Sequence, residues 1–179
     1  LYAPTWKGSD YNHPAVDVDE YIHFKRTIES MIDTDRYQVL LKPHQVVYKE
    51  LKKSGRISDA LIPAFIDTNE LLSVTDILIS DYSSIFYDYL ATDRPVIFYI
   101  PDLAEYRNYR GLYMEPEDLP GPCFTKLSEV GEVINNLEHY KNEYRSSYEK
   151  TKAFACPKDD GNVCRRIIDI VFYGRTSDE

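Results

Sequence analysis

Short apolar runs alternate along the chain with stretches in which apolar residues recur at helical spacing. The apolar runs predict strands at residues 2–6, 37–42, 61–66, 76–80 and 95–100. The helical spacing predicts helices at 20–32, 46–53, 69–73, 83–91 and 163–173, and one long or two shorter helices over 128–153. Strands and helices that alternate at such short intervals are typical of βαβ units. The pattern therefore predicts an α/β fold with a Rossmann-like, mainly parallel sheet and helices on both faces.

Two of the expected strands say more about the sheet. The run Asp76-Ile77-Leu78-Ile79-Ser80 is typical of a parallel strand that is covered on both faces. Pro63 interrupts the run at 61–66 and predicts an edge or irregular strand, because proline cannot donate to the sheet. Residues 7–19 and 101–122 are expected to be mainly loop, and 174–179 a frayed tail. No linker divides the chain, so residues 1–179 are expected to form a single domain.

Composition places the chain among ordinary globular proteins. Its 179 residues are 43% hydrophobic and 28% charged, and no apolar run approaches the roughly 20 residues of a membrane-spanning helix. The 21 basic and 30 acidic side chains give a net charge of −9, which disfavours nucleic acid and anionic membranes as partners. The three cysteines form no C-x-x-C pattern, so we expect neither a zinc site nor a disulfide framework. The chain lacks an initiator methionine and opens on an apolar run, so we expect a piece of a longer protein.

Polar residues follow several of the expected strands, at the edge of the sheet where α/β folds bind their ligands. Lys42 and His44 follow one strand, Asp81 follows another, and Arg110 lies in the charged loop after the last clear strand. We expect these segments to converge. No G-x-G-x-x-G, Walker, H-E-x-x-H or G-x-S-x-G motif is present, which counts against dehydrogenases, nucleoside triphosphatases, zinc proteases and α/β-hydrolases.

The segment Asp81-Tyr82-Ser83-Ser84 is the sharpest candidate for a binding site. A strand that turns directly into a helix presents free N–H groups at the positive end of the helix dipole, and the two serines add hydroxyl donors. Such a turn can hold a phosphate or diphosphate without a glycine-rich loop. The alternative is a plain helix cap, in which the same residues satisfy the first N–H groups of the helix.

Four further residues have a binding interpretation beside a structural one. His44 either hydrogen-bonds a phosphate or acts as acid or base, or it is a surface histidine that begins a helix. Lys42 either balances phosphate charge or is a solvated strand-end lysine. Arg110 either grips a phosphate or lies in a solvated loop, and Asp160 either binds a ligand hydroxyl or caps the last helix. No carboxylate cluster suited to magnesium is evident, so we expect neither a metal site nor a required cofactor.

A series of motifs occurs in the order found in a known family. The motifs are Leu1-Tyr2-Ala3-Pro4-Thr5-Trp6, Leu41-Lys42-Pro43-His44, Ile79-Ser80-Asp81-Tyr82-Ser83-Ser84, Phe86-Tyr87-Asp88-Tyr89-Leu90, Arg94-Pro95-Val96-Ile97-Phe98-Tyr99, Tyr106-Arg107, Arg110-Gly111, Asp118-Leu119-Pro120-Gly121-Pro122, and Asp159-Asp160-Gly161 with Arg166. The series resembles the C-terminal half of the CDP-glycerol glycerophosphotransferases, the polymerases and primases of bacterial teichoic acid synthesis. The resemblance covers nearly the whole chain.

The resemblance implies the donor-binding C-terminal domain of a two-domain GT-B glycosyltransferase-like fold. It implies transfer of glycerol phosphate from CDP-glycerol to a polyol-phosphate polymer, with release of CMP. The N-terminal domain of the same protein would hold the acceptor and the membrane attachment. The whole protein is then expected in the cytoplasm, peripheral on the inner face of the cell membrane, with no direct membrane insertion by this segment and no nucleic acid partner.

The resemblance also assigns roles to residues at matching positions. His44 corresponds to a family histidine needed for activity, in contact with donor phosphate, and Ser83 and Ser84 correspond to the diphosphate-binding turn. Together with Lys42, Asp81, Arg110 and Asp160 they form the expected donor site, in which His44 is the catalytic candidate.

The sequence departs from the family pattern in three ways. Gln45 follows the histidine where the family often has proline, and Ser80 stands where the family commonly has threonine. A second family histidine, the candidate general base, belongs to the N-terminal half. Because a missing base costs about 10²–10⁴ in rate, we expect this chain to bind donor weakly and to turn over negligibly.

Two alternatives stay open. The first is a different donor. The same motifs recognise a nucleotide diphosphate and would suit CDP-ribitol, or a nucleotide sugar in capsule or wall polysaccharide synthesis. The second alternative is a non-catalytic module that docks a partner through its sixteen tyrosines, since tyrosine suits half-buried interfaces.

Overall fold

The computed structural model describes residues 1–10, 13–15 and 17–175, so the end of the expected tail lies outside the described residues. A parallel sheet forms its centre, with β3 (Leu78–Ser80), β4 (Val96–Tyr99) and β5 (Cys123–Phe124) in that order. The strands predicted at 76–80 and 95–100 are confirmed, and β5 was not predicted.

Three extended segments continue the sheet beyond β3. Tyr2 pairs in parallel with Ile79 on one side and with Leu41 on the other, and Leu41 pairs in parallel with Leu61. The strands expected at the corresponding places are therefore single bridges. The sequence explains why: Pro4, Pro43 and Pro63 each stand two residues after a bridge residue. A proline lacks the N–H that would continue the ladder, so each pairing stops there.

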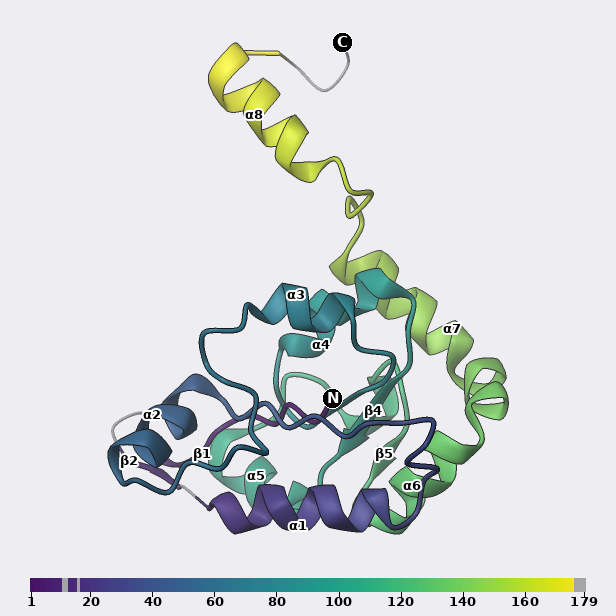
Figure 1. Ribbon diagram of the computed structural model, residues 1–179. Coiled ribbons are helices and arrows are strands. Elements are labelled where there is room, and N and C mark those ends of the chain that lie inside the picture. The colour runs from purple at the N-terminus through teal and green to yellow at the C-terminus, as the bar shows by residue number, and fades with distance from the viewer. Residues whose placement is uncertain (11–12, 16, 176–179) are drawn as a thin grey trace.

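Helices cover both faces of the sheet, as predicted (Figure 1). On one face lie α1 (Val18–Glu29), α2 (Gln45–Lys53) and α6 (Leu127–Asn135), which pack on Ile79 and Ile97. These helices bury apolar side chains at helical spacing, as the periodicity predicted. They include Tyr21, Phe24, Ile28, Val47, Leu51, Val130 and Ile134.

The opposite face is covered by α3 (Thr68–Ser73), α4 (Ile85–Tyr89) and part of α7 (Leu137–Ala155). Leu78, Val96 and Phe98 point to this side and are fully buried. Successive strand residues alternate between two covered faces, which is why β3 and β4 are apolar at nearly every position.

The structure corrects both stretches that were expected to be mainly loop. The elements found there are a hairpin of β1 (Lys7–Asp10) and β2 (His13–Ala15), helix α5 (Leu103–Arg110) and a 3₁₀ turn at Pro116–Asp118. Helix α5 escaped the periodicity analysis because none of its residues is buried. It lacks the apolar stripe that such an analysis detects.

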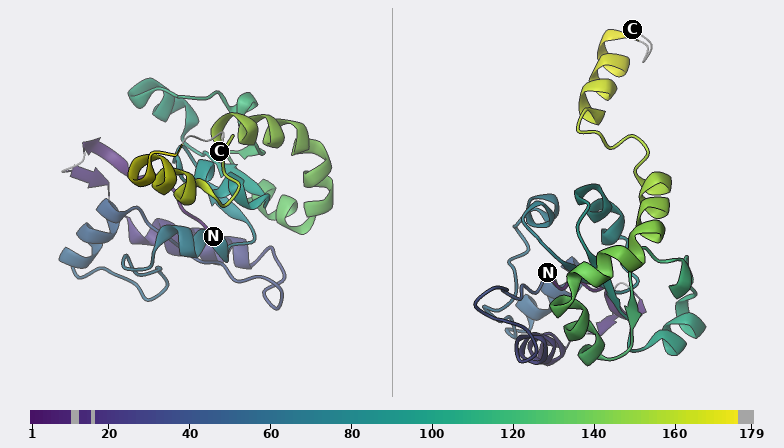
Figure 2. Two further views of the ribbon diagram at one scale, coloured as in Figure 1. Left: turned by 90° about the horizontal axis from the view of Figure 1, so that it is seen from above. Right: turned by 90° about the vertical axis from the view of Figure 1, so that its right-hand side faces the viewer.

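The C-terminal part of the chain contains two helices before the last one. The stretch 128–153 is divided into α6 and α7 at Asn136. Helix α8 (Val163–Tyr173) is confirmed, yet it stands away from the body of the molecule (Figures 1 and 2). None of its residues is buried, and the apolar Ile167 and Val171 are 53% and 66% exposed. Within the described residues, no helix has the length and apolarity needed to cross a membrane.

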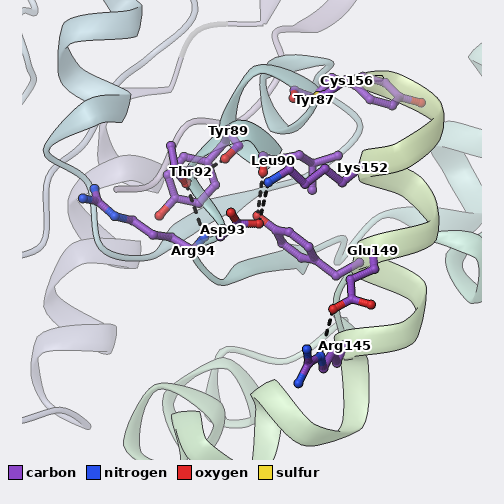
Figure 3. A network of polar contacts seen from close by, with 11 residues as sticks. Tyr87, Tyr89, Leu90, Thr92, Asp93, Arg94, Arg145, Glu149, Lys152 and Cys156 are labelled. Carbon is purple, nitrogen blue, oxygen red and sulfur yellow. Dashed lines mark hydrogen bonds and ion pairs between the residues drawn. The ribbon is translucent and has the colours of Figure 1, made fainter. Parts of the chain in front are cut away.

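A polar network ties α7 to the turn that leads into β4 (Figure 3). Asp93 adopts a left-handed conformation with φ of 57° at the end of a 3₁₀ turn (Leu90–Thr92), and Lys152 of α7 pairs with its carboxylate at 2.6 Å. The neighbouring Arg94 donates to the carbonyl of Thr75 over 2.7 Å. These contacts fix the start of β4 against the helices on one face.

Gly121 has no room for a side chain, because a Cβ there would lie 2.1 Å from the carbonyl oxygen of Val96. Backbone of β4 cannot yield cheaply, so Gly121→Ala is expected to lower the free energy of unfolding by about 2–3 kcal/mol in urea denaturation.

Gly131 in α6 is the matched control, since an added Cβ there would lie 3.0 Å from the Cβ and the Sδ of Met31, a contact that a shift of a few tenths of an ångström relieves. The gain in helix propensity of about 1 kcal/mol offsets that adjustment, so Gly131→Ala should change stability little. Equal losses in the two variants would contradict the steric explanation.

Candidate functional site

A cavity of about 680 Å³ lies at the carboxyl ends of the sheet segments. Its walls come from the segment after Tyr2, the turn after β3, helix α5 and the loop at 111–114. This is the edge of the sheet at which the sequence placed the candidate residues. The lining residues are Thr5, Trp6, His44, Asp81, Tyr82, Ser83, Ser84, Phe86, Tyr87, Tyr106, Arg110, Gly111, Leu112, Tyr113, Met114 and Leu119.

The structure brings together most, but not all, of the predicted site residues. His44, Asp81, Ser83, Ser84 and Arg110 all line the cavity. Lys42 and Asp160 do not line it. The Asp160 carboxylate lies on the exposed segment before α8 and pairs with Arg166 at 2.7 Å. What each lining residue does for a ligand stays a prediction.

The turn after β3 differs from the helix start that the sequence suggested. Helix α4 begins at Ile85 and has only five residues, so its dipole is small. The Ser83 amide donates to Asp81 Oδ1 over 3.2 Å, and the Ile85 amide donates to Ser83 Oγ over 3.4 Å. Among the described residues, Ser84 has no partner for its amide or hydroxyl. Ser84 therefore offers both its amide and its hydroxyl to a ligand, and the Ser83 hydroxyl, whose oxygen only accepts here, also keeps its proton free to donate.

Asp81 is buried at the base of the cavity, with 5% of its surface exposed. Its Oδ1 accepts a second hydrogen bond from the Thr5 amide over 2.7 Å. Burial raises the pKa of Asp81 to about 7, because removing the carboxylate from water disfavours its charged form. The sequence placed Asp81 among the phosphate-binding residues, whereas here it accepts hydrogen bonds from the backbone of two cavity walls.

His44 both begins a helix and lines the cavity, so its two interpretations are compatible. Its Nδ1 accepts a hydrogen bond from the Val46 amide over 3.3 Å, which caps α2. Burial lowers the pKa of His44, so the imidazole is neutral near pH 7. A neutral ring that accepts at Nδ1 has its proton on Nε2. His44 therefore offers an N–H donor to the cavity.

Arg110 supplies positive charge at the rim of the cavity. Its guanidinium lies 4.1 Å from the centroid of the Trp6 ring and donates to the carbonyl of Gly8 over 2.9 Å. The cation–π contact holds the planar group in place and leaves part of its donor fork available.

Aromatic residues that the sequence analysis missed form a second part of the wall. The rings of Tyr82 and Tyr106 stack with centroids 3.6 Å apart, and the Tyr82 hydroxyl donates to Asp102 Oδ1 over 3.1 Å. The four-residue spacing of Tyr106 and Arg110 is a helical signal that could have revealed one face of α5.

Polar side chains and aromatic or apolar side chains both line the cavity. Serine, histidine and arginine donors suit an anionic group, and the aromatic and apolar side chains suit a flat ring. No group of three or more histidine, cysteine, aspartate or glutamate side chains in the described part of the chain is placed to hold a metal ion. The arrangement can bind a nucleotide by both its base and its phosphates.

Comparison with known proteins gives a consistent set of matches. A family model described as CDP-Glycerol:Poly(glycerophosphate) glycerophosphotransferase matches residues 1–173. The teichoic acid poly(glycerol phosphate) polymerase of Staphylococcus epidermidis is 30% identical over 96% of this chain and 24% of its own length. The teichoic acid poly(ribitol-phosphate) polymerase of Bacillus spizizenii is 29% identical over 97% of this chain and 27% of its own length. The chain thus spans about a quarter of these two relatives.

The solved structures agree with the sequence matches. The wall teichoic acid polymerase TagF matches with a TM-score of 0.72 and 29% identity, over 97% of this chain and 42% of that one. A TagF variant soaked with CDPG matches with a TM-score of 0.68 over 94% of this chain and 39% of that one. These matches confirm the predicted fold class, an α/β domain of the GT-B glycosyltransferase-like type.

The cap made by His44 can be tested through stability. His44→Ala removes the acceptor for the Val46 amide and is expected to lower the free energy of unfolding by about 1 kcal/mol near neutral pH. His44→Asn keeps an oxygen in the capping position and is expected to restore most of that loss. Equal urea midpoints for the two variants would contradict the cap.

The same cap predicts a pH dependence. Because burial lowers the pKa of His44, the unfolded chain binds more protons than the folded one just below the ordinary histidine value of 6.5. The stability that His44 contributes is therefore complete above that pH and is lost as pH falls. In a comparison of urea midpoints, the difference between wild type and His44→Ala should shrink toward about pH 5, whereas His44→Asn should keep its advantage.

Proposed function

Because the chain belongs to the CDP-glycerol:poly(glycerophosphate) glycerophosphotransferase family, we propose that its cavity binds CDP-glycerol for transfer of glycerol phosphate to a polyol-phosphate polymer, with release of CMP. The observation that carries this proposal is the cavity itself, in which His44, Ser84 and Arg110 present donors beside an aromatic wall. The chain spans less than half of the relatives it matches, so the activity of the whole protein is part of the proposal.

The residue types fit phosphoryl transfer, which depends on positioning and charge stabilisation more than on covalent chemistry. In the proposed complex, Ser84 and the Nε2–H of His44 donate to diphosphate oxygens. Arg110 balances the charge that develops on the departing CMP. The aromatic and apolar side chains of the cavity hold the cytosine ring.

His44 is poorly arranged to act as a general base. Its Nδ1 is engaged by the Val46 amide, and its Nε2 has the proton. We therefore assign His44 to donor binding and assign removal of the acceptor proton to a group beyond this chain. This supports the expectation of negligible turnover by the chain alone, for which CMP release from CDP-glycerol is the assay.

Three further parts of the proposal concern the setting of the reaction. Transfer proceeds without a metal cofactor. The test is whether the whole protein stays active in EDTA. The acceptor is a polyol-phosphate polymer held by another domain of the same protein. The whole protein acts in the cytoplasm, on the inner face of the cell membrane, and this segment contacts neither the lipid interior nor nucleic acid.

The identity of the donor alcohol is a second question. The relatives support two candidates, glycerol and ribitol. A glycerol-phosphate polymerase of Bacillus subtilis and the ribitol-phosphate polymerase of Bacillus spizizenii are both 29% identical to this chain. The cavity groups described above address the nucleotide and not the alcohol. A donor panel of CDP-glycerol, CDP-ribitol and a nucleotide sugar, assayed with the whole protein, decides between them.

Calorimetric titration with CDP-glycerol tests the named site. His44→Asn keeps the cap but loses the Nε2–H donor, and a hydrogen bond to a charged group contributes roughly 1.5–3 kcal/mol. The expected result is a loss of affinity of about tenfold or more, and Ser84→Ala should change affinity in the same direction. Identical affinities in all these proteins would reject the site.

Two sets of variants sharpen that titration. His139→Asn is the matched control, because His139 lies on the surface and pairs with Glu143. Lys42→Ala and Asp160→Asn separate the geometry from the family resemblance, since neither side chain lines the cavity. Unchanged affinity in both favours the cavity as described, and a tenfold loss in either would show that the ligand extends beyond it.

A further inference from the structure

Asp81 is a buried carboxyl group that the proposed transfer does not use. It lies directly after β3, between the segment that contains Thr5 and the turn that contains Ser83. Both of these segments line the cavity. One side chain therefore joins two walls of the cavity. The two amides that it binds, those of Thr5 and Ser83, are 78 residues apart in the sequence.

The two oxygens of this carboxyl group have different surroundings. Oδ1 accepts from the Thr5 amide at 2.7 Å and from the Ser83 amide at 3.2 Å. Oδ2 has no hydrogen-bond partner among the described residues. Every fully buried side-chain oxygen in that part of the chain has a partner, so Oδ2 is not fully enclosed, and Asp81 lines the cavity. Oδ2 thus faces the place where an anion is expected.

The charged groups around Asp81 have opposing effects on its ionisation. Lys7 of β1 favours ionisation, and Asp102, which precedes α5, opposes it. Lys7 is already paired with Asp102 at 2.9 Å. Among the described residues, the other titratable groups that face Asp81 or share its cavity are Tyr2, Tyr21 of α1, Tyr82, Tyr87 of α4, Tyr106 and Arg110 of α5, Tyr113, and His44 at the start of α2.

We propose that Asp81 is a positioning residue that holds both walls of the cavity through Oδ1 and couples the binding of an anionic ligand to the uptake of one proton on Oδ2. The proposal rests on the proposed function for its ligand, a nucleoside diphosphate ester. Two negative groups in one cavity oppose each other, so the ligand favours the protonated carboxyl group. A protonated Oδ2 then donates to the ligand, while Oδ1 goes on accepting from both walls.

The consequence is a binding affinity that depends on pH near neutrality. Burial raises the pKa of Asp81 to about 7 in the free protein, and a bound anion raises that pKa further. Above that pH, binding must add a proton to Asp81, so the affinity should fall by up to about tenfold for each pH unit. CDP-glycerol is the suitable probe, because both of its phosphates are esterified and neither titrates in this range.

The positioning part is tested without ligand, by hydrogen exchange at the Thr5 and Ser83 amides. Asp81→Ala should accelerate exchange at both amides, whereas Asp81→Asn keeps an oxygen acceptor and should leave both protected. Ser80→Ala is the matched control, because the Ser80 hydroxyl joins the same two segments by donating to Ala3 O over 2.8 Å and does not line the cavity. Unchanged exchange in Asp81→Ala overturns the positioning role.

The coupling part is tested by titrating CDP-glycerol between about pH 6 and 8.5 in buffers of different ionisation enthalpy, which reports protons taken up. Wild type should approach one proton per ligand above neutrality, with affinity falling as pH rises. Asp81→Asn should show no uptake from this site and little change in affinity with pH. Uptake that persists in Asp81→Asn, or its absence from a wild type that binds, overturns the coupling.

Failure of the proposed function gives a different result. A wild type that binds no CDP-glycerol at any pH rejects the proposed ligand. The pH dependence of stability then tests the buried acid by itself: because its pKa is raised on folding, stability should fall as pH rises from about 4 through 7 in wild type relative to Asp81→Asn. Parallel stability curves for the two proteins would overturn the assignment of a neutral, buried Asp81.

Discussion

The backbone pairing of Tyr2 with a chain segment on each side is the constraint on which the cavity depends. Its amide donates to Leu40 O over 2.8 Å, and its carbonyl accepts from the Lys42 amide over 2.9 Å. On the other side, the Ile79 amide donates to Leu1 O over 2.7 Å. Three parallel segments thereby leave the sheet at one edge. In each segment, a residue that lines the cavity follows the paired residue within three positions: Thr5 after Tyr2, His44 after Leu41 and Asp81 after Ile79. Without this pairing, nothing local would bring His44 beside the turn after β3.

Burial of the paired residues makes such short pairings sufficient. Tyr2, Leu41 and Ile79 are each no more than 5% exposed, and they belong to the core that α1, α2 and α6 cover. The apolar area removed from water holds the extended segments in register where only a bridge of hydrogen bonds exists. Pro4 and Pro43, which end two of these bridges, come directly before Thr5 and His44 of the cavity. The same residues therefore limit the strands and create the edge at which a ligand can bind.

The sequence was sufficient where one element determines its own pattern. Helix α2 buries apolar residues at helical spacing, and strand β3 is buried at every position, so helical periodicity predicted the first and a continuous apolar run predicted the second. Helix α5 buries none of its residues and left no such signal. The cavity could likewise be predicted only in part. Residues that directly follow a strand could be placed at the edge of the sheet by topology alone. The contact of Arg110 with Trp6 could not, since it depends on how distant segments pack.

Asp160 is a residue that the sequence placed at the ligand and the structure places elsewhere. Its position before the last helix and its match to a family motif suggested a place at the ligand. In the structure, it lies on the segment that leads to α8, which stands away from the body of the molecule (Figure 1). Its carboxylate is engaged by Arg166 instead. A motif fixes which residues occur together in the sequence, but the path of the chain after α7 decides whether they reach the cavity.

Three polar residues of the cavity share one property: each engages the backbone of the fold with one atom and lines the cavity. His44 caps α2 through Nδ1, Asp81 holds two walls through Oδ1, and Arg110 donates to Gly8 O while it stacks on Trp6. Groups held in this way need little reorganisation when a ligand binds, which strengthens their electrostatic effect. It also means that alanine removes a structural contact and a ligand contact together. Asparagine at His44 or Asp81 separates the two, because its oxygen preserves the backbone bond and leaves the other function to be measured.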